Sequence, residues 1–152
     1  MESRYLFRGK RTDNGEWEIG SLIALPDGKF EIANKCENPP DGDPMWRKCV
    51  ITHYVDPSTI CQYTGLKDKN GKLIWENDIV SFAHKKYATD TLVFAEHKYT
   101  RNYVIEFENT FCNYGLRFRN KSIHFQCTQA TLCTHDCEVM GNVFDNPELL
   151  EV

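Results

Sequence analysis

The fold class is indicated most clearly by residues 55–80, which read VDPSTICQYTGLKDKNGKLIWENDIV. Turn-forming residues interrupt this segment at 56–59, at Asn70-Gly71 and at 76–78. The pieces between the turns are short and rich in aromatic and β-branched residues, as in strands joined by tight turns. Asn77 suits such a corner because asparagine is one of the few residues besides glycine that adopt a left-handed backbone. Helix signals are scarce, so the sequence predicts an all-β chain.

The same pattern extends toward the N-terminus. The predicted strands there cover residues 5–7, 17–24, 30–32 and 50–55. Turn signals separate the first three strands: Asn14-Gly15, which is typical of a two-residue hairpin turn, and then Pro26-Asp27-Gly28. The proline-rich residues 36–48 predict a loop, because proline removes donors from a strand ladder. We therefore expect residues 1–64 to form an N-terminal β-meander region.

Toward the C-terminus, alternating patterns predict strands over 103–108 and 113–120 and a last strand over 138–144. Asn146-Pro147 then starts a short helical turn, because asparagine caps helices and proline suits the first helical position. Residues 84–98 have no clear period, so an extended excursion and a single strand with flexible flanks both remain open. The order of strand, acidic turn and strand around residue 77 favours a small barrel, and we expect residues 65–152 to form a second domain.

Composition excludes several classes of protein. With 152 residues, 41% hydrophobic and 26% charged, the chain is expected to bury a core and not to be disordered or collagen-like. The net charge of -4 gives no overall basic field for nucleic acid or anionic membranes. No apolar run approaches the length of about 20 residues that a spanning helix needs, and the N-terminal residues lack the apolar core of a secretory signal. We therefore expect a cytoplasmic protein that does not enter a membrane.

The cysteines do not predict a disulfide framework or a metal centre. Their number, seven, is odd, and the cytoplasm keeps thiols reduced. One cluster contains metal-ligating residue types, namely Cys127, Cys133, His135 and Cys137. It lacks the C-x2-C turns of structural zinc sites, and residues on one face of a strand lie about 7 Å apart. We expect no metal and no cofactor, although the sequence leaves open whether these four residues ever bind a metal.

Catalytic candidates are scattered and have structural explanations. His135 lies beside Cys137, and His53 lies near Asp56, but a histidine in an alternating strand is more often a hydrogen-bonded surface or core residue. Asp78 stands in a turn, where backbone capping is the expected role of a carboxylate. The sequence contains no phosphate-binding loop, dinucleotide fingerprint, zinc-protease motif or nucleophile elbow. We therefore predict that the protein is not an enzyme and has no catalytic residue.

A nucleic-acid interface has somewhat better support. Between Lys85 and Lys121 there are seven basic and four acidic residues, a local charge of 7 - 4 = +3, whereas residues 136–152 hold five acids and no base. Aromatic residues alternate with these bases, and small barrels can present such aromatics for base stacking. The candidate contact residues are Tyr99, Arg101, Tyr103, Arg117, Arg119 and Lys121. A solvated outer strand face is the favoured explanation for the arginines at 117 and 119, because the apolar residues at 116 and 118 occupy the opposite face.

Several segments together resemble the YopX family of phage and prophage proteins. They are FRGK (7–10), NGEW (14–17), most of residues 55–80, and VMGNVFDNPELL (139–150). The resemblance covers nearly the whole chain in order and is weakest over 33–49 and 83–136. Cys61 and Asn77 depart from the family pattern, which favours glycine at both turns. The resemblance implies a mostly β protein of phage or prophage origin whose C-terminal part, residues 65–152, is an SH3-like barrel, and it implies no activity, cofactor or catalytic residue.

The sequence therefore predicts a non-enzymatic phage or prophage accessory protein in the cytoplasm of a bacterial host, acting as a protein-interaction module. Short strands leave sheet edges that invite pairing, so the partner could include a second copy of the chain. A nucleic-acid-binding small β-barrel is the first alternative. An enzyme with an unrecognised site is the second.

Overall fold

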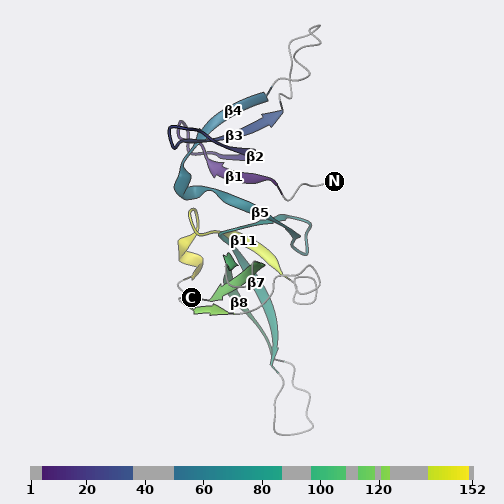
Figure 1. Ribbon diagram of the computed structural model, residues 1–152. Coiled ribbons are helices and arrows are strands. Elements are labelled where there is room, and N and C mark those ends of the chain that lie inside the picture. Colours follow the sequence, from purple (N-terminus) through teal and green to yellow (C-terminus); the bar gives the residue numbers. More distant parts are fainter. Residues whose placement is uncertain are drawn as a thin grey trace. The chain divides into compact units, whose positions relative to one another are not determined.

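A computed structural model describes residues 5–35, 50–86, 97–108, 113–118, 121–123 and 137–150 (Figure 1). The secondary structure in these residues consists of eleven β-strands and two short 3₁₀ turns. The prediction of an all-β chain is thus confirmed. The chain divides into two compact units, residues 1–63 and residues 64–152, which are described here one after the other.

The first unit is built from an antiparallel meander of short strands. Its elements are β1 (Phe7–Lys10), β2 (Trp17–Ala24), β3 (Phe30–Lys35), β4 (Val50–Val55), the 3₁₀ turn η2 (Pro57–Thr59) and the beginning of β5 (Cys61–Lys67). Each of the first three strands pairs with the next, and β5 returns to pair with β1. The strands predicted over 17–24 and 50–55 have the predicted bounds. The full order of this sheet is β4-β3-β2-β1-β5-β6, where β6 covers Leu73–Trp75.

Local turn chemistry explains how these strands are joined. The hairpin between β1 and β2 closes with a hydrogen bond from Arg11 N to Glu16 O, so its loop is longer than the two-residue turn that Asn14-Gly15 predicts. Gly15 has a φ of 74°, a left-handed conformation that glycine adopts without strain. Before η2, the Asp56 carboxylate accepts a hydrogen bond from Ser58 N at 2.9 Å and caps the turn, as the sequence predicts.

The sequence predicts small barrels, but the pairings among the described residues form open sheets. The nearest approach to closure in the first unit is an isolated antiparallel bridge between Arg11 and Val55. Thr12 N donates to Tyr54 O at 3.0 Å, and Asp56 N donates to Lys10 O at 2.8 Å. These bonds join the ends of β1 and β4 without forming a continuous strand pair.

Close backbone approach requires glycine at one position of this meander. A Cβ atom at Gly20 would lie 2.3 Å from Ala33 O and 2.9 Å from an Ile32 methyl group. Ile32 itself is completely buried, so this side of β2 and β3 faces the core of the unit. The missing side chain in β2 lets β3 pack directly against it.

The second unit contains a five-stranded antiparallel sheet with the order β10-β9-β8-β7-β11. Its elements are β6 (Leu73–Trp75), β7 (Asp78–Lys86), β8 (His97–Glu108), β9 (Asn113–Phe118), β10 (Lys121–Ile123), β11 (Glu138–Asn142) and the 3₁₀ turn η3 (Pro147–Leu150). The helical turn predicted after residue 146 is therefore confirmed. Part of the undecided region is strand, since β7 extends to Lys86 and β8 begins at His97.

One apolar cluster forms the core of the second unit. Its buried members are Ile74, Val80, Phe82, Tyr103, Ile105, Leu116, Cys137 and Val139. The rings of Phe82 and Tyr103 meet edge to face with their centroids 5.7 Å apart. The alternation predicted over 103–108 holds at its first two positions, whereas Phe107 is 43% exposed.

The turn before β7 is fixed by a buried carboxylate. Asp78, almost fully buried, accepts a hydrogen bond from Trp75 N at 2.8 Å, which confirms the predicted capping role. Asn77, between them, has a φ of 64°, the left-handed conformation expected from the sequence.

Among the described residues, no helix is long and apolar enough to cross a membrane.

Candidate functional site

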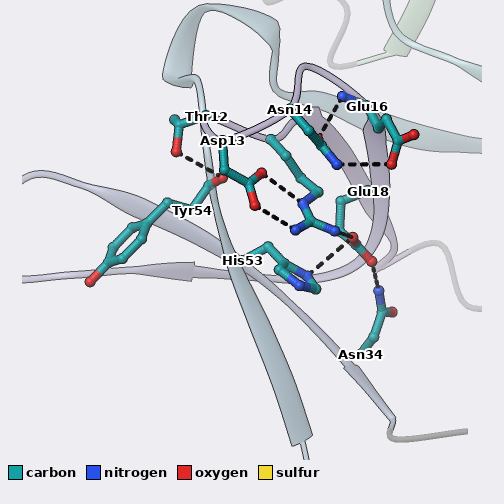
Figure 2. Close-up of polar contacts among 9 residues, drawn as sticks. Thr12, Asp13, Asn14, Glu16, Glu18, Asn34, His53 and Tyr54 are labelled. Atoms are coloured by element: carbon teal, nitrogen blue, oxygen red, sulfur yellow. Dashed lines mark hydrogen bonds and ion pairs between the residues drawn. The ribbon is translucent and has the colours of Figure 1, made fainter.

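The first unit carries a polar cluster on the core-facing side of its sheet. Strand register fixes this arrangement. Glu18 in β2 lies two residues from Gly20, and side chains two apart in a strand share a face. Asn34 in β3 likewise shares the face of Ile32, and Ile32 pairs directly with His53 in β4. Glu18, Asn34 and His53, together with Arg11 at the end of β1, form what we call the inner cluster (Figure 2).

Glu18 is the centre of the inner cluster. Its side chain is 17% exposed, and its Oε2 lies 3.1 Å from His53 Nδ1 and 3.8 Å from an Arg11 guanidinium nitrogen. Asn34 donates a hydrogen bond from Nδ2 to the other carboxylate oxygen. The His53 nitrogen is buried and within ion-pair distance, but its contact with Glu18 is not aligned as a hydrogen bond. A mostly buried carboxylate is thus surrounded by a cation, an amide and an imidazole.

Arg11 is held in this position by a second carboxylate. Its Nε donates to Asp13 Oδ1 at 2.9 Å and a terminal nitrogen donates to Asp13 Oδ2 at 2.6 Å, a bidentate pair (Figure 2). The side-chain hydrogen bonds raise the pKa of Arg11 and lower the pKa of Asp13. The guanidinium therefore remains charged and directed between Asp13 and Glu18.

The inner cluster brings an imidazole beside a carboxylate but does not form a metal centre. In the part of the chain that the structure describes, no three His, Cys, Asp or Glu side chains gather closely enough to hold a metal ion. The arrangement is that of a buried ion-pair network, which orders the ends of β1 to β4.

The sequence suggested a different partner for His53. Asp56, the acid considered there, accepts hydrogen bonds from Ser58 N and Ser58 Oγ, which lower the pKa of its carboxyl group. The acid beside His53 is Glu18, which is distant in sequence. The sequence holds no signal for this pair, because alternation in β2 sets Glu18 opposite the apolar residues Ile19 and Ile23 and so predicts an exposed glutamate.

The opposite face of the same sheet carries exposed apolar and aromatic side chains. Strand register places Trp17, Ile19, Ile23 and Tyr54 on this side, and we call them the outer-face patch. Ile19, Ile23 and Tyr54 are 37–47% exposed. Cations surround the aromatic members, with the Arg8 guanidinium 4.6 Å from the Trp17 ring centre and Lys29 Nζ 5.6 Å from that of Tyr54. Apolar surface with cationic borders is typical of a contact surface.

The residues predicted to contact nucleic acid do not gather on one face of the second unit. Tyr103 is 4% exposed and belongs to the core, whereas Arg101 is exposed. Arg117 forms an ion pair with Glu106, and it pairs in register with Val104, so it lies on the face opposite Tyr103.

The other three predicted contact residues are less completely placed. Tyr99 lies in β8 and Lys121 in β10, and Arg119 lies outside the described residues. The nucleic-acid interface thus remains a prediction without a common surface for its described members.

The four residues that were weighed as a possible metal or catalytic site lie largely outside the described residues. Cys127, Cys133 and His135 are not described, and Cys137 is completely buried in the core of the second unit. Whether these residues bind a metal stays open.

Asp68 was not predicted as a site residue, yet it holds two segments together. Its Oδ1 accepts hydrogen bonds from Asn70 N at 2.8 Å and Lys72 N at 2.9 Å, and its Oδ2 accepts one from Val139 N at 3.1 Å. Burial acts to raise its pKa, but these amide hydrogen bonds outweigh burial and lower the pKa. The buried carboxylate is structural and joins the 68–72 turn to β11.

Comparisons with known proteins agree on the family and the fold. The family model described as YopX protein matches residues 6–151. No curated protein matches the sequence significantly. The crystal structure of protein EF1440 from Enterococcus faecalis is similar with a TM-score of 0.53 and 23% sequence identity, over 95% of this chain and 96% of that one. At this identity the similarity is one of fold.

Proposed function

Since the chain belongs to the YopX protein family, we propose that it is a phage or prophage accessory protein that acts as a non-enzymatic protein-interaction module. Its site of action would be the cytoplasm of a bacterial host. The outer-face patch is the surface that we assign to the partner protein.

The observation that carries this proposal is the grouping of Trp17, Ile19, Ile23 and Tyr54 on one face of a small sheet. Large aromatic and aliphatic residues are the usual anchors of protein interfaces, and arginine is the cation most enriched there. Arg8 beside Trp17 supplies that combination. The inner cluster supports the patch from the other face, because its ion pairs fix the ends of the strands that carry the patch.

Two alternatives have less support from the described side chains. The nucleic-acid hypothesis needs an exposed aromatic platform, and Tyr103 is buried. The enzyme hypothesis needs reactive groups that converge, and the Glu18–His53 contact has an ordinary structural explanation as part of the network that orders the strand ends. A surface for protein contact requires only the exposed groups that β2 and β4 present.

We include the barrel form of the units in the proposal. The Arg11–Val55 bridge joins the ends of β1 and β4, and β5 pairs with β1, which is how a meander begins to close on itself. The SH3-like barrel expected for residues 65–152 belongs to the same proposal. An experimental structure in which the strands of residues 65–152 close into a barrel would support it, and an open sheet over those residues would contradict it.

The interaction is tested by affinity capture from bacterial lysate with and without nuclease, using the full chain. Ile19→Lys and Ile23→Lys each place a charge in the outer-face patch. Met140→Lys is the matched control, because Met140 is an exposed apolar residue of the second unit. We expect a defined protein to be captured by the wild type and the control regardless of nuclease, and to be lost with either patch variant.

Other outcomes contradict the proposal in different ways. Capture that disappears with nuclease would favour the nucleic-acid alternative. Equal capture by all four proteins would place the interface elsewhere on the molecule.

A further inference from the structure

The two sheets end in four edge strands, and only one of them lacks features that block pairing. Among the described residues these edges are β4, β6, β10 and β11. β6 and β10 have three residues each, and β11 contains a register shift between Val139 and Gly141. β4 has six residues in continuous register with β3, and its sequence VITHYV contains no lysine, acid or proline. Short length, bulges, charges and proline are the devices that protect edges, so β4 is the unprotected one.

Hydrogen bonding shows which groups of β4 point outward. Tyr54 O accepts a bond from Thr12 N at 3.0 Å, so the backbone polar groups of Tyr54 point away from β3. These groups alternate along an antiparallel strand. The amides and carbonyls of Thr52 and Val50 therefore point toward the same edge of β4. These residues precede Tyr54, where the hydrogen bond from Thr12 occupies that edge.

We infer that a second copy of this chain pairs with β4, antiparallel, about a two-fold axis at Ile51. This inference rests on the proposed interaction function and names one partner for it. The geometry pairs Val50 of each copy with Thr52 of the other through two hydrogen bonds per pair. Ile51 then faces Ile51 of the second copy at the close spacing of a non-hydrogen-bonded pair.

Two features of β4 favour its own copy as the occupant. Self-pairing sets no like charges opposite each other, because β4 has no lysine, arginine or acid, and such charges are what usually oppose identical strands. It also covers exposed apolar surface, since Val50 is 59% and Ile51 41% exposed, and β-branched pairs are favourable across strands. In a closed two-fold dimer the β4 edges of the two copies pair with each other, so neither of them stays open for a third copy.

The two interfaces are compatible. Ile51 lies on the face opposite Tyr54, so pairing at Ile51 leaves Ile19 and Ile23 exposed for a different protein. A contact of three residue pairs is small compared with stable interfaces, so the dissociation constant is expected to be on the order of 0.1 mM.

Sedimentation equilibrium of the full chain at protein concentrations from about 10 µM to 1 mM covers the range below and above the expected dissociation constant of the dimer. Ile51→Lys places two ammonium groups at the two-fold axis and should weaken dimerisation at least about tenfold. Thr52→Pro removes an edge donor that β3 does not use, and it should abolish dimerisation while preserving the monomer. Ile19→Lys is the matched control, because it adds the same charge to an exposed position of the same sheet and should leave the dimer unchanged.

The outcomes separate this inference from the proposed function. A wild type that stays monomeric to 1 mM, or dimers that Ile51→Lys does not weaken, would overturn the β4 pairing. Neither result affects capture of another protein through Ile19 and Ile23. If Thr52→Pro fails to fold, Ile51→Lys still decides the question, because its side chain is already partly in solvent.

Discussion

Replacing Asp68 with asparagine should destabilise the C-terminal unit by about 3 kcal/mol. The carboxylate accepts three backbone hydrogen bonds while it is only 5% exposed, from Asn70, Lys72 and Val139. Asparagine keeps one oxygen, which can serve the first two amides, but its NH₂ group would face the Val139 amide, so donor meets donor. A lost hydrogen bond to a charged group costs about 1.5–3 kcal/mol, and an unsatisfied buried amide adds to that loss.

Asp68→Ala removes both oxygens and should cost about 5 kcal/mol, toward the upper end of single-residue effects. Asp27→Asn is the matched control. Asp27 is an exposed turn residue whose carboxylate accepts a hydrogen bond from Lys29 N at 3.1 Å and pairs with Lys29 Nζ at 3.1 Å, so its replacement should leave the midpoint of urea unfolding nearly unchanged.

Urea unfolding followed by circular dichroism gives the change in free energy, and amide hydrogen exchange locates it. We expect the Val139 amide to lose protection first in Asp68→Asn, while the amides of Asn70 and Lys72 lose it only in Asp68→Ala. The reasoning would be refuted by Asp68→Asn unfolding at the wild-type urea concentration with the Val139 amide still protected. Equal effects of the asparagine and alanine variants would also contradict it.

Three further outcomes are expected. Asn77→Ala should destabilise the protein by about 1–2 kcal/mol in urea unfolding, because alanine lacks the short polar side chain that lets asparagine adopt a φ of 64°, whereas Asn77→Gly should be neutral or stabilising because glycine has no Cβ. Gly20→Ala should cost more than about 2 kcal/mol in the same assay, because the new Cβ would lie 2.3 Å from Ala33 O. The pKa of Asp68 is lowered by folding, so its contribution is complete above the unfolded pKa of about 3.9 and is lost as the pH falls through the lower folded value. Between about pH 5 and pH 2, the free energy of unfolding should therefore fall more steeply with decreasing pH for the wild type than for Asp68→Asn.

Local chemistry made much of the fold predictable. The corner at Asn77, the cap at Asp56 and the buried cap at Asp78 depend on neighbouring residues only, and the structure has all three. The strands over 17–24 and 50–55 were equally readable, because alternation and turn residues both mark their ends.

The inner cluster could not be predicted in the same way. Glu18 and His53 meet only because β3 lies between β2 and β4 in a particular register, and register is set by the whole sheet. The basic stretch shows the same limit. Arg117 appears available in the sequence, but the pairing of β8 with β9 brings Glu106 against it. The charge of a segment does not reveal which partners the sheet supplies.

The central claim is that the outer face of the N-terminal sheet is a protein-contact surface. Amide hydrogen exchange of the full chain, alone and with the protein recovered by affinity capture, tests this claim most directly. Our account predicts added protection in β2 around Ile19 and Ile23 and in β4 at Tyr54. Protection confined to β8 and β9, or no change anywhere, would contradict it.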